Sequence, residues 1–375
     1  YLREHEGMDS GVTGEAKAYF KFKDKDGNGE LDEAEWMAGK QRPLEHWWKQ
    51  FDRWWEKNNR NNSVAKDPLP VDPKPVTEKQ DQVKNKSKIN TLTAEQAAEL
   101  VADTGHLQQE TDLWIGSLTE INQDVARELA KLQCEILCFE SLTTIDAGVA
   151  QELAKFQGKK LFLGATTTID AEVAHELAKF QGDHLFLRLT TIDIEVAQEL
   201  AKFQRGELQL DDLITIDEFV AKELAKFEGD CLNLWDLKNI DEFVAKELAR
   251  SKANNLDLHD LRTIDKYVAQ ELTALRCNTL YLNHIYSIDN DTAQSVGNFQ
   301  VDRLALSGLK SISKEAAQAF ANFKGELYLT GMRRMNKEIA QELSKFQGKN
   351  LYLNKSIIDS ENRQYFESNT RIIEK

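Results

Sequence analysis

The stretch from Leu142 to Gly164, LTTIDAGVAQELAKFQGKKLFLG, decides the fold because the chain repeats it with few changes. The next two copies are TTTIDAEVAHELAKFQGDHLFL, residues 166–187, and LTTIDIEVAQELAKFQRGELQL, residues 189–210. The Leu-x-Leu motif that closes each copy, in which Ile115 and Phe139 replace the second leucine of the first two copies, begins at Leu113, Leu137, Leu161, Leu185, Leu208, Leu232, Leu256, Leu280, Leu304, Leu327 and Leu351. Successive motifs are 24 residues apart, except for two gaps of 23 residues. The chain therefore contains eleven copies of one structural unit.

The closing motif of each unit predicts a short strand. Leu161 and Leu163 are two positions apart, so both point to the same side of a strand, and Phe162 points to the other side. One unit cannot bury the leucine side by itself, whereas stacked units can. This need for stacking explains why the sequence of the unit recurs with few changes.

The rest of the unit predicts a helix. Asp170 is expected to cap its N-terminus, because the carboxylate can accept hydrogen bonds from the free backbone N–H groups of the first turn. Glu176 and Lys179 lie three positions apart and are expected to pair on the surface. Gly182 is expected to end the helix. The apolar stripe consists of Val173, Leu177 and Phe180. The recurring Ile-Asp pair is therefore interpreted as architecture and not as chemistry.

A period of about 20–29 residues headed by Leu-x-Leu is typical of leucine-rich repeats. The wording LxLxxLTTIDxxVAxELAKFxG resembles bacterial leucine-rich repeat proteins in which a helix follows each strand, and the resemblance covers residues 113–369. It implies an α/β solenoid, a horseshoe or arc with parallel strands and outer helices. The unit lacks the Asn or Cys that commonly follows the strand in such proteins, so its turn must be closed differently.

Prolines mark a boundary near the N-terminus. All five lie between residues 43 and 75, and residues 57–88 are rich in Asn, Pro and Lys, which predicts an extended linker. The linker separates a small helical module, residues 1–56, from a repeat domain, residues 89–375. Residues 89–112 are interpreted as an N-terminal cap, eleven repeats begin at residue 113, and the tail after Leu353 is interpreted as a degenerate C-terminal cap.

The chain has four cysteines, Cys134, Cys138, Cys231 and Cys277, whose spacing matches neither a zinc ribbon nor a redox pair. Cys231 and Cys277 belong to units two apart, which places them roughly 10 Å from each other. A disulfide requires Cα atoms within about 7 Å. We therefore predict four free thiols, and a Cys134–Cys138 disulfide is the alternative.

The residue between the two leucines of each motif forms a row on the strand face that points away from the core. Six of its eleven members are aromatic: Trp114, Phe162, Phe186, Tyr281, Tyr328 and Tyr352. Outward aromatic side chains mark a surface that binds a partner or is covered by another part of the chain. In the alternative interpretation, aromatic residues simply suit strands and stack along the sheet. We predict that this row binds another protein.

Polar residues replace the aromatic ones in three middle units. They are Asp211, Asp212, Asn233, Trp235, Asp236, Asp257, His259 and Asp260. This group could be an acidic patch for a basic partner or a weak cation site. The simplest interpretation is a solvated polar face.

The segment DKDGNGELDEAE, residues 24–35, matches the calcium loop of the EF-hand, and the resemblance implies a bound Ca²⁺. Gly29 provides the sharp turn at the sixth position. The predicted ligands are the side chains of Asp24, Asp26, Asn28, Asp32 and Glu35 and the backbone carbonyl of Glu30. Calcium suits this loop because it takes six to eight hard oxygen ligands in a flexible geometry.

The calcium loop leads into an exit helix, EAEWMAGK, and the next helix is predicted in LEHWWKQFDRWWEKNN, which begins at Leu44. Its apolar stripe consists of Trp47, Phe51, Trp54 and Trp55. This helix could be a vestigial second hand that packs on the first, or an aromatic surface that binds another protein. Membrane contact through residues 44–56, as an interfacial helix, is the third alternative.

Composition and motifs limit the function. The net charge of −15 disfavours a general nucleic-acid binder, because phosphate repels an acidic surface. The sequence contains no nucleophile elbow, P-loop or dinucleotide fingerprint. We therefore expect a non-enzymatic protein-binding or scaffolding protein, in which the EF-hand serves structure or attachment. A calcium-dependent adhesion or regulatory component of the cell envelope is the alternative.

A calcium loop and a first residue, Tyr1, that is not Met fit a processed extracytoplasmic protein, either periplasmic or secreted. Free cysteines are more typical of reducing compartments. We expect an extracytoplasmic location.

Overall fold

The computed structural model describes residues 92–104, 112–116, 118–367, 369 and 372–374. The chain divides into two units, Tyr1–Val76 and Thr77–Lys375, and all described residues belong to the second. The predicted calcium loop, the Trp-rich helix and the whole predicted linker, residues 57–88, lie outside the described residues.

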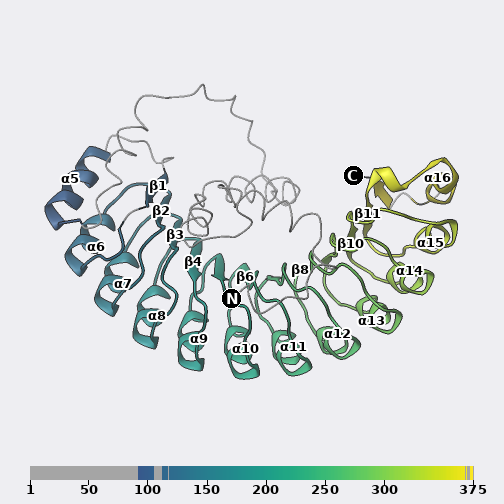
Figure 1. Ribbon diagram of the computed structural model, residues 1–375, viewed down its shortest axis with the longest axis horizontal. Coiled ribbons are helices and arrows are strands. Elements are labelled where there is room, and N and C mark those ends of the chain that lie inside the picture. Colours follow the sequence, from purple (N-terminus) through teal and green to yellow (C-terminus); the bar gives the residue numbers. More distant parts are fainter. Residues whose placement is uncertain (1–91, 105–111, 117, 368, 370–371, 375) are drawn as a thin grey trace, which may run out of the picture. The chain divides into compact units, whose positions relative to one another are not determined.

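The described unit is a solenoid of alternating strands and helices (Figure 1). The strands are β1 (Asp112–Ile115), β2 (Ile136–Phe139), β3 (Lys160–Leu163), β4 (His184–Arg188), β5 (Glu207–Asp211), β6 (Cys231–Asn233), β7 (Asn255–Asp257), β8 (Thr279–Tyr281), β9 (Arg303–Ala305), β10 (Glu326–Leu329), β11 (Asn350–Leu353) and β12 (Ile372–Glu374). They form one parallel sheet in which each strand pairs with the next along the chain.

The helices lie on the convex side of this unit and the strands on the concave side (Figure 1). They are α5 (Ala94–Thr104), α6 (Gln123–Leu129), α7 (Ala147–Leu153), α8 (Ala171–Leu177), α9 (Ile194–Leu200), α10 (Glu218–Leu224), α11 (Glu242–Leu248), α12 (Lys266–Leu272), α13 (Asn290–Val296), α14 (Lys314–Ala321), α15 (Lys337–Leu343) and α16 (Ser360–Phe366), with a 3-10 turn η1 (Lys355–Ile357). None of the helices in the described ranges is both long and apolar enough to cross a bilayer.

The predicted leucine-rich-repeat solenoid is confirmed by this arrangement. The first leucine of each of the eleven motifs lies on β1 to β11, and these leucines pair in register, as Leu161 does with Leu137 and Leu185. The C-terminal tail forms more structure than expected, because α16 and β12 repeat the helix and strand of a twelfth, worn unit, and β12 pairs with β11.

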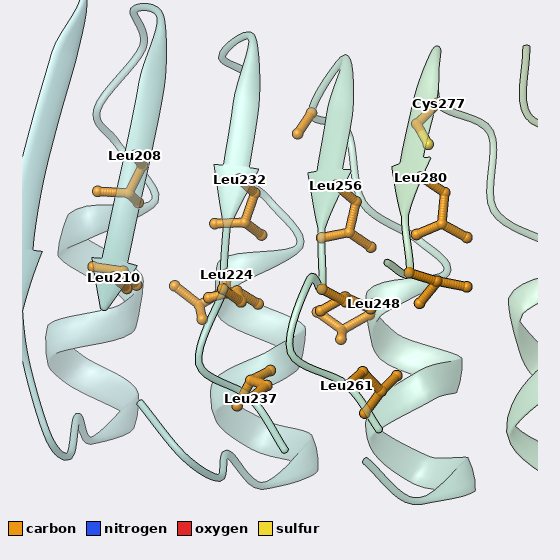
Figure 2. Packing of buried hydrophobic residues seen from close by; sticks show 14 of the residues in the cluster. Leu208, Leu210, Leu224, Leu232, Leu237, Leu248, Leu256, Leu261, Cys277 and Leu280 are labelled. Atoms are coloured by element: carbon orange, nitrogen blue, oxygen red, sulfur yellow. The ribbon is translucent and has the colours of Figure 1, made fainter. Parts of the chain in front are cut away.

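The leucines build a continuous core between the sheet and the helices. Leu208, Leu232, Leu256 and Leu280 occupy the same place in successive strands and are fully buried (Figure 2). Each of these side chains contributes about 1.5–3 kcal/mol when it leaves water. Every unit buries its apolar edge against two neighbours, which is how a solenoid is stabilised.

The helix starts are as predicted, and the helix ends are not. The Asp170 carboxylate caps α8 by accepting the backbone N–H of Val173 at 2.9 Å, and the equivalent Asp caps α7 and α9 to α13. The Glu176–Lys179 pair is also present at 2.7 Å. Helix α8, however, ends at Leu177, so the prediction that Gly182 ends it is wrong.

The chain leaves each helix through a tighter turn. The N–H of Lys179 donates to the carbonyl of Glu176, and the N–H of Phe180 donates to that of Leu177. Phe180 is still fully buried, although it lies beyond the helix. Gly182 is needed for a different reason: a Cβ there would lie 2.5 Å from the carbonyl oxygen of Lys159 in the preceding unit.

Threonines close the turn that lacks the usual Asn or Cys. The Thr143 N–H donates to the carbonyl of Thr119 at 3.0 Å, and the Thr190 N–H donates to that of Thr167 at 2.9 Å. The buried Thr166 hydroxyl donates to the carbonyl of Leu142 at 2.9 Å. These bonds join successive units and satisfy backbone groups that the strands leave unpaired.

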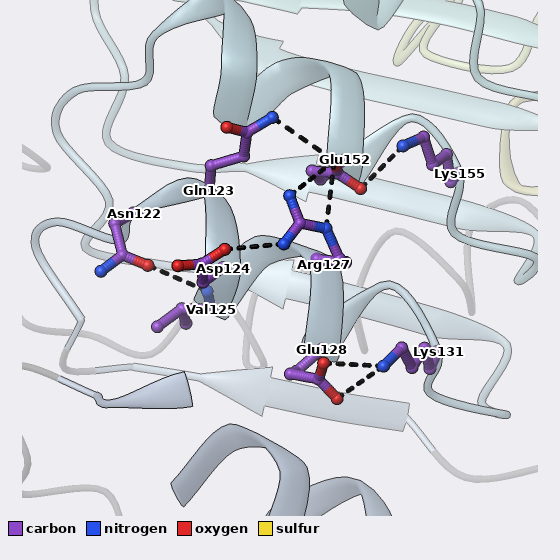
Figure 3. A network of polar contacts seen from close by, with 9 residues as sticks. All are labelled: Asn122, Gln123, Asp124, Val125, Arg127, Glu128, Lys131, Glu152 and Lys155. Atoms are coloured by element: carbon purple, nitrogen blue, oxygen red, sulfur yellow. Dashed lines mark hydrogen bonds and ion pairs between the residues drawn. The ribbon is translucent and has the colours of Figure 1, made fainter. Parts of the chain in front are cut away.

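Polar contacts also tie neighbouring helices together, and Figure 3 shows one such network. The buried carboxylate of Glu152 on α7 accepts hydrogen bonds from Gln123 and Arg127 of α6 at 3.4 and 3.3 Å. Lys155 completes the network at 2.8 Å, and its hydrogen bond holds the pKa of Glu152 below the usual range. A buried carboxylate is tolerated here because cations neutralise it.

The four cysteines are free thiols, as predicted, and no Cys134–Cys138 disulfide forms. Cys138, Cys231 and Cys277 are buried. Burial raises the pKa of the Cys277 thiol to about 12 and that of Cys231 well above its ordinary value. These thiols are therefore unreactive at neutral pH.

Candidate functional site

The predicted aromatic row lies on the concave strand face, opposite the leucine side. Phe162, Phe186, Tyr281 and Tyr352 are only 2–7 % exposed, and Trp114 and Tyr328 are half-buried. Ring pairs stack along the sheet: Trp114 with Phe162 at 6.4 Å, Phe162 with Phe186 at 5.1 Å, and Tyr328 with Tyr352 at 4.2 Å. Stacking along the ladder is thus present, and the role of the row in binding a partner stays a prediction.

The polar middle of the concave face is buried. Asp211, Asn233 and Asp257 are 7 %, 1 % and 5 % exposed, so the interpretation of these three as a solvated face is wrong. They share the face with Glu207, which the sequence analysis missed because it precedes the Leu-x-Leu motif. Parallel pairing of β5, β6 and β7 brings the four side chains onto three neighbouring strands.

Hydrogen bonds distribute the charge of these carboxyl groups unequally. The Glu207 carboxylate accepts from Asn233 Nδ2 at 2.9 Å and contacts His184 Nδ1 at 3.1 Å. Although burial raises the pKa of Glu207, these two partners outweigh it, and the pKa lies below its usual range. Burial raises the pKa of Asp211 to about 8, with added repulsion from Asp236 and Asp212.

Asp257 is the least satisfied member of this group. Burial first, and then the charge of Glu207, raises the pKa of Asp257 well above its ordinary value. Its Oδ1 is one of the buried side-chain atoms in the described region without a hydrogen-bond partner. The group therefore combines Glu207, whose partners favour the charged form, with Asp211 and Asp257, whose burial favours the protonated form, an arrangement that a cationic side chain or a donor group would stabilise.

A chain of ion pairs runs along the loops that follow β4 to β8. Arg188 contacts Asp212 at 2.8 Å, and the Asp212 N–H donates to Asp236 at 3.2 Å. Lys238 bridges Asp236, at 3.2 Å, and Asp260. Asp212 has a φ of 67°, the left-handed region, which Asp tolerates better than most residues. The strand-end loops are thus joined by ion pairs and by one backbone hydrogen bond.

This series of ion pairs ends at two histidines, His259 and His284. Asp260 also pairs with His284, whose ring lies 4.6 Å from that of His259. Asn283 Nδ2 lies 3.3 Å from His259 Nδ1, and the Trp235 ring lies 4.8 Å from the His259 ring. Burial and the positive charge of His284 lower the pKa of His259 to about 4, so this imidazole is neutral at pH 7. His284 was missed in the sequence because it lies one unit beyond the residues grouped there.

A different surface carries the exposed apolar side chains. Phe219, Phe243 and Tyr267, which we name the helix-start ridge, occupy the second position of α10, α11 and α12 and are 55 %, 54 % and 52 % exposed. The other exposed large apolar residues in the described region are Ile194, Ile214 and Tyr286. All six belong to the middle of the repeat array.

The remaining predicted site residues fall outside the described residues. These are the calcium ligands Asp24, Asp26, Asn28, Glu30, Asp32 and Glu35 and the aromatic stripe Trp47, Phe51, Trp54 and Trp55. Their roles stay predictions.

No family model matches this chain, and no curated protein matches its sequence. Three solved structures have a similar arrangement at low identity. The crystal structure of a TLR13–ssRNA13 complex matches with 17 % identity over 73 % of this chain and 39 % of that chain, at a TM-score of 0.46. The Toll–Spatzle complex, described in Drosophila development and innate immunity, matches with 11 % identity over 70 % of this chain and 42 % of that chain, at 0.42.

The third, a yeast Rad7–Elc1 complex, matches with 14 % identity over 80 % of this chain and 92 % of that chain, at a TM-score of 0.36. This chain spans about two fifths of the length of the first two matched chains. At these identities and scores the likeness carries no argument about function, and the leucine-rich-repeat architecture rests on the periodic sheet itself.

Proposed function

We propose that this protein is a non-enzymatic binding or scaffolding protein whose repeat solenoid holds a protein partner. The observation that carries the proposal is the helix-start ridge. Three large rings at one register position of consecutive helices are each more than half exposed. Soluble proteins seldom expose contiguous apolar patches without a binding role, whereas single exposed apolar residues are common.

The three rings of the helix-start ridge are aligned by the repeat itself. The units around α10, α11 and α12 differ little in backbone, so equal positions in the repeat fall side by side along the stack. The first helix positions beside the rings are Glu218, Glu242 and Lys266, and the Lys266 ammonium lies 5.0 Å from the centroid of the Tyr267 ring. A partner with apolar side chains and a mainly basic rim fits this surface best.

The concave face would supply a second contact surface. Its aromatic members Phe186 on β4 and Tyr281 on β8 lie on the strands next to the group of Glu207, Asp211 and Asp257, which would favour a basic segment of the partner. The two surfaces differ in exposure: the rings of the helix-start ridge are exposed, and Phe186 and Tyr281 of the concave row are buried.

We expect the triple substitution Phe219→Ser, Phe243→Ser and Tyr267→Ser to weaken partner capture at least about tenfold, because aromatic anchors dominate interface energies. Stability should change little, because exposed residues contribute within about 0.5 kcal/mol each. The measurement is a pull-down from native extract, followed by titration of the captured protein, beside a thermal melt of each variant.

The matched control is Glu218→Ala, Glu242→Ala and Lys266→Ala, which changes the neighbouring positions and leaves the rings in place. Equal capture by wild type and the ring variant would contradict the ridge as the binding surface. A loss of many degrees in the melting temperature would show that the rings stabilise the fold instead.

We also propose that calcium binds the EF-hand loop and serves structure or attachment, which would suit an extracytoplasmic, periplasmic or secreted location. The loop sequence supports the proposal, with oxygen ligands at every position that calcium uses. The alternative, a calcium-dependent adhesion or regulatory component of the cell envelope, would use the same site.

Calorimetric titration of the full chain with calcium is expected to show one site. Glu35→Ala should abolish it, because the last loop position supplies the bidentate carboxylate. The matched control is Glu30→Gln, because Glu30 contributes a backbone carbonyl that the substitution keeps. Heat of binding that survives Glu35→Ala would contradict the assigned loop.

A further inference from the structure

The strand-end loops after β7 and β8 bring two imidazoles and one carboxylate together. One ligand atom each from His259, Asp260 and His284 lies within 4.8 Å of the others, and all three side chains are half-buried. We propose that these three residues bind a divalent transition-metal ion of the zinc type, at a site separate from the predicted calcium loop.

The backbone holds the two histidines in register. The N–H of His284 donates to the carbonyl of His259 at 2.9 Å, so the two loops are joined directly at these residues. The same pattern joins Asp260 to the unit before it, because its N–H donates to the carbonyl of Trp235 at 3.0 Å. The three ligands therefore sit on a fixed frame, and only side-chain torsions separate them from a closed site.

The donor atoms select the class of metal. Imidazole nitrogens suit zinc and its neighbours in the first transition row, whereas calcium and magnesium take oxygen ligands. Zinc binds His nitrogen and Asp oxygen at about 2.0–2.2 Å, which places tetrahedral ligand atoms about 3.3 Å apart. The ligand atoms lie within 4.8 Å of one another, which exceeds this separation by at most about 1.5 Å, a difference that side-chain rotation can close. Three protein ligands leave the fourth position to water.

Lys238 is a built-in competitor for this site. Its ammonium bonds to Asp260, and it is shared with Asp236 at 3.2 Å. A metal ion that binds Asp260 must displace the ammonium, and Asp236 can retain it. Removal of this positive charge should therefore strengthen metal binding, an effect opposite in sign to that of removing a ligand.

The test is calorimetric titration of the full chain with zinc chloride, in excess calcium so that oxygen sites are filled. We expect one zinc equivalent that His284→Gln and Asp260→Asn each weaken at least about tenfold, a loss typical of damaged metal sites. The matched control is His175→Gln. His175 contacts a single carboxylate, Glu199, at 2.8 Å and does not belong to the three-ligand group.

Lys238→Met is the decisive second variant, because misfolding cannot mimic a gain in affinity. We expect its zinc affinity to rise about tenfold, with a circular dichroism spectrum equal to that of wild type. The proposal would be overturned if wild type bound no zinc at up to about a 100-fold molar excess of zinc over protein. It would also be overturned if His175→Gln reduced zinc binding as much as His284→Gln does. A Lys238→Met affinity that does not rise would remove Asp260 from the ligand set and overturn it equally.

Discussion

Phe203→Ala is expected to lower the free energy of unfolding by about 3–5 kcal/mol, the range for deletion of a buried ring. Phe203 is fully buried, and its ring stacks between Phe180 at 6.4 Å and Phe227 at 6.3 Å, with interplanar angles of 8° and 10°. The cavity would lie in the middle of a stack that Phe156 extends on one side. Loss of one ring thus removes contacts with two neighbouring units at once.

The expected response is local because each repeat contacts only its neighbours. Urea unfolding followed by circular dichroism measures the loss, and amide exchange should rise first in α9 and α10, the helices on either side of Phe203. Phe219→Ala is the matched control, since the same ring is removed from an exposed site, and it should cost within about 0.5 kcal/mol. Equal losses in the two variants would contradict the assignment of Phe203 to the core.

The fold was predictable from the sequence because each repeat contains the signals for its own strand and for the start of its own helix. The side of the strand on which Leu161 lies follows from local alternation, and Asp170 caps its helix through the N–H of Val173 nearby in the sequence, so each unit carries these signals within itself. The end of the helix was not predictable in this way. Phe180 keeps helical spacing and is buried, but the tighter turn after Leu177 carries it into the core.

The candidate sites depend on contacts that the pattern of a single unit does not reveal. His259 and His284, and likewise Glu207 and Asn233, come together only because neighbouring loops and strands stack with a definite register. Alignment of successive units could have found His284, since it falls one repeat after His259. The burial of Phe162 and Asp257 could not have been found, because alternation predicts which face a side chain occupies and not what covers it.

Gly206→Ala is expected to lower the free energy of unfolding by at least about 2 kcal/mol. Gly206 has a φ of +44°, which costs an L-residue roughly 1–2 kcal/mol. A Cβ there would also lie 1.7 Å from the carbonyl oxygen of Asp183, so backbone must move. That movement would strain two inter-unit bonds, from the Glu207 N–H to Asp183 at 2.7 Å and from the Asp230 N–H to Gly206 at 2.6 Å.

Gly148→Ala, at another glycine of the same solenoid, is expected to keep or raise the free energy of unfolding. Gly148 is the second residue of α7, a register position that holds Glu172 in α8 and Phe219 in α10. A Cβ there would lie 3.3 Å from Asp146 Oδ1 and from Gln123 Cδ, a close contact that the flexible Gln123 side chain can relieve. Helix propensity then favours alanine by up to about 1 kcal/mol. Urea unfolding of both variants compares the two sites directly. A Gly206→Ala variant as stable as Gly148→Ala would mean that the chain between Phe203 and β5 can relax, and that the left-handed turn is not required to join β4, β5 and β6.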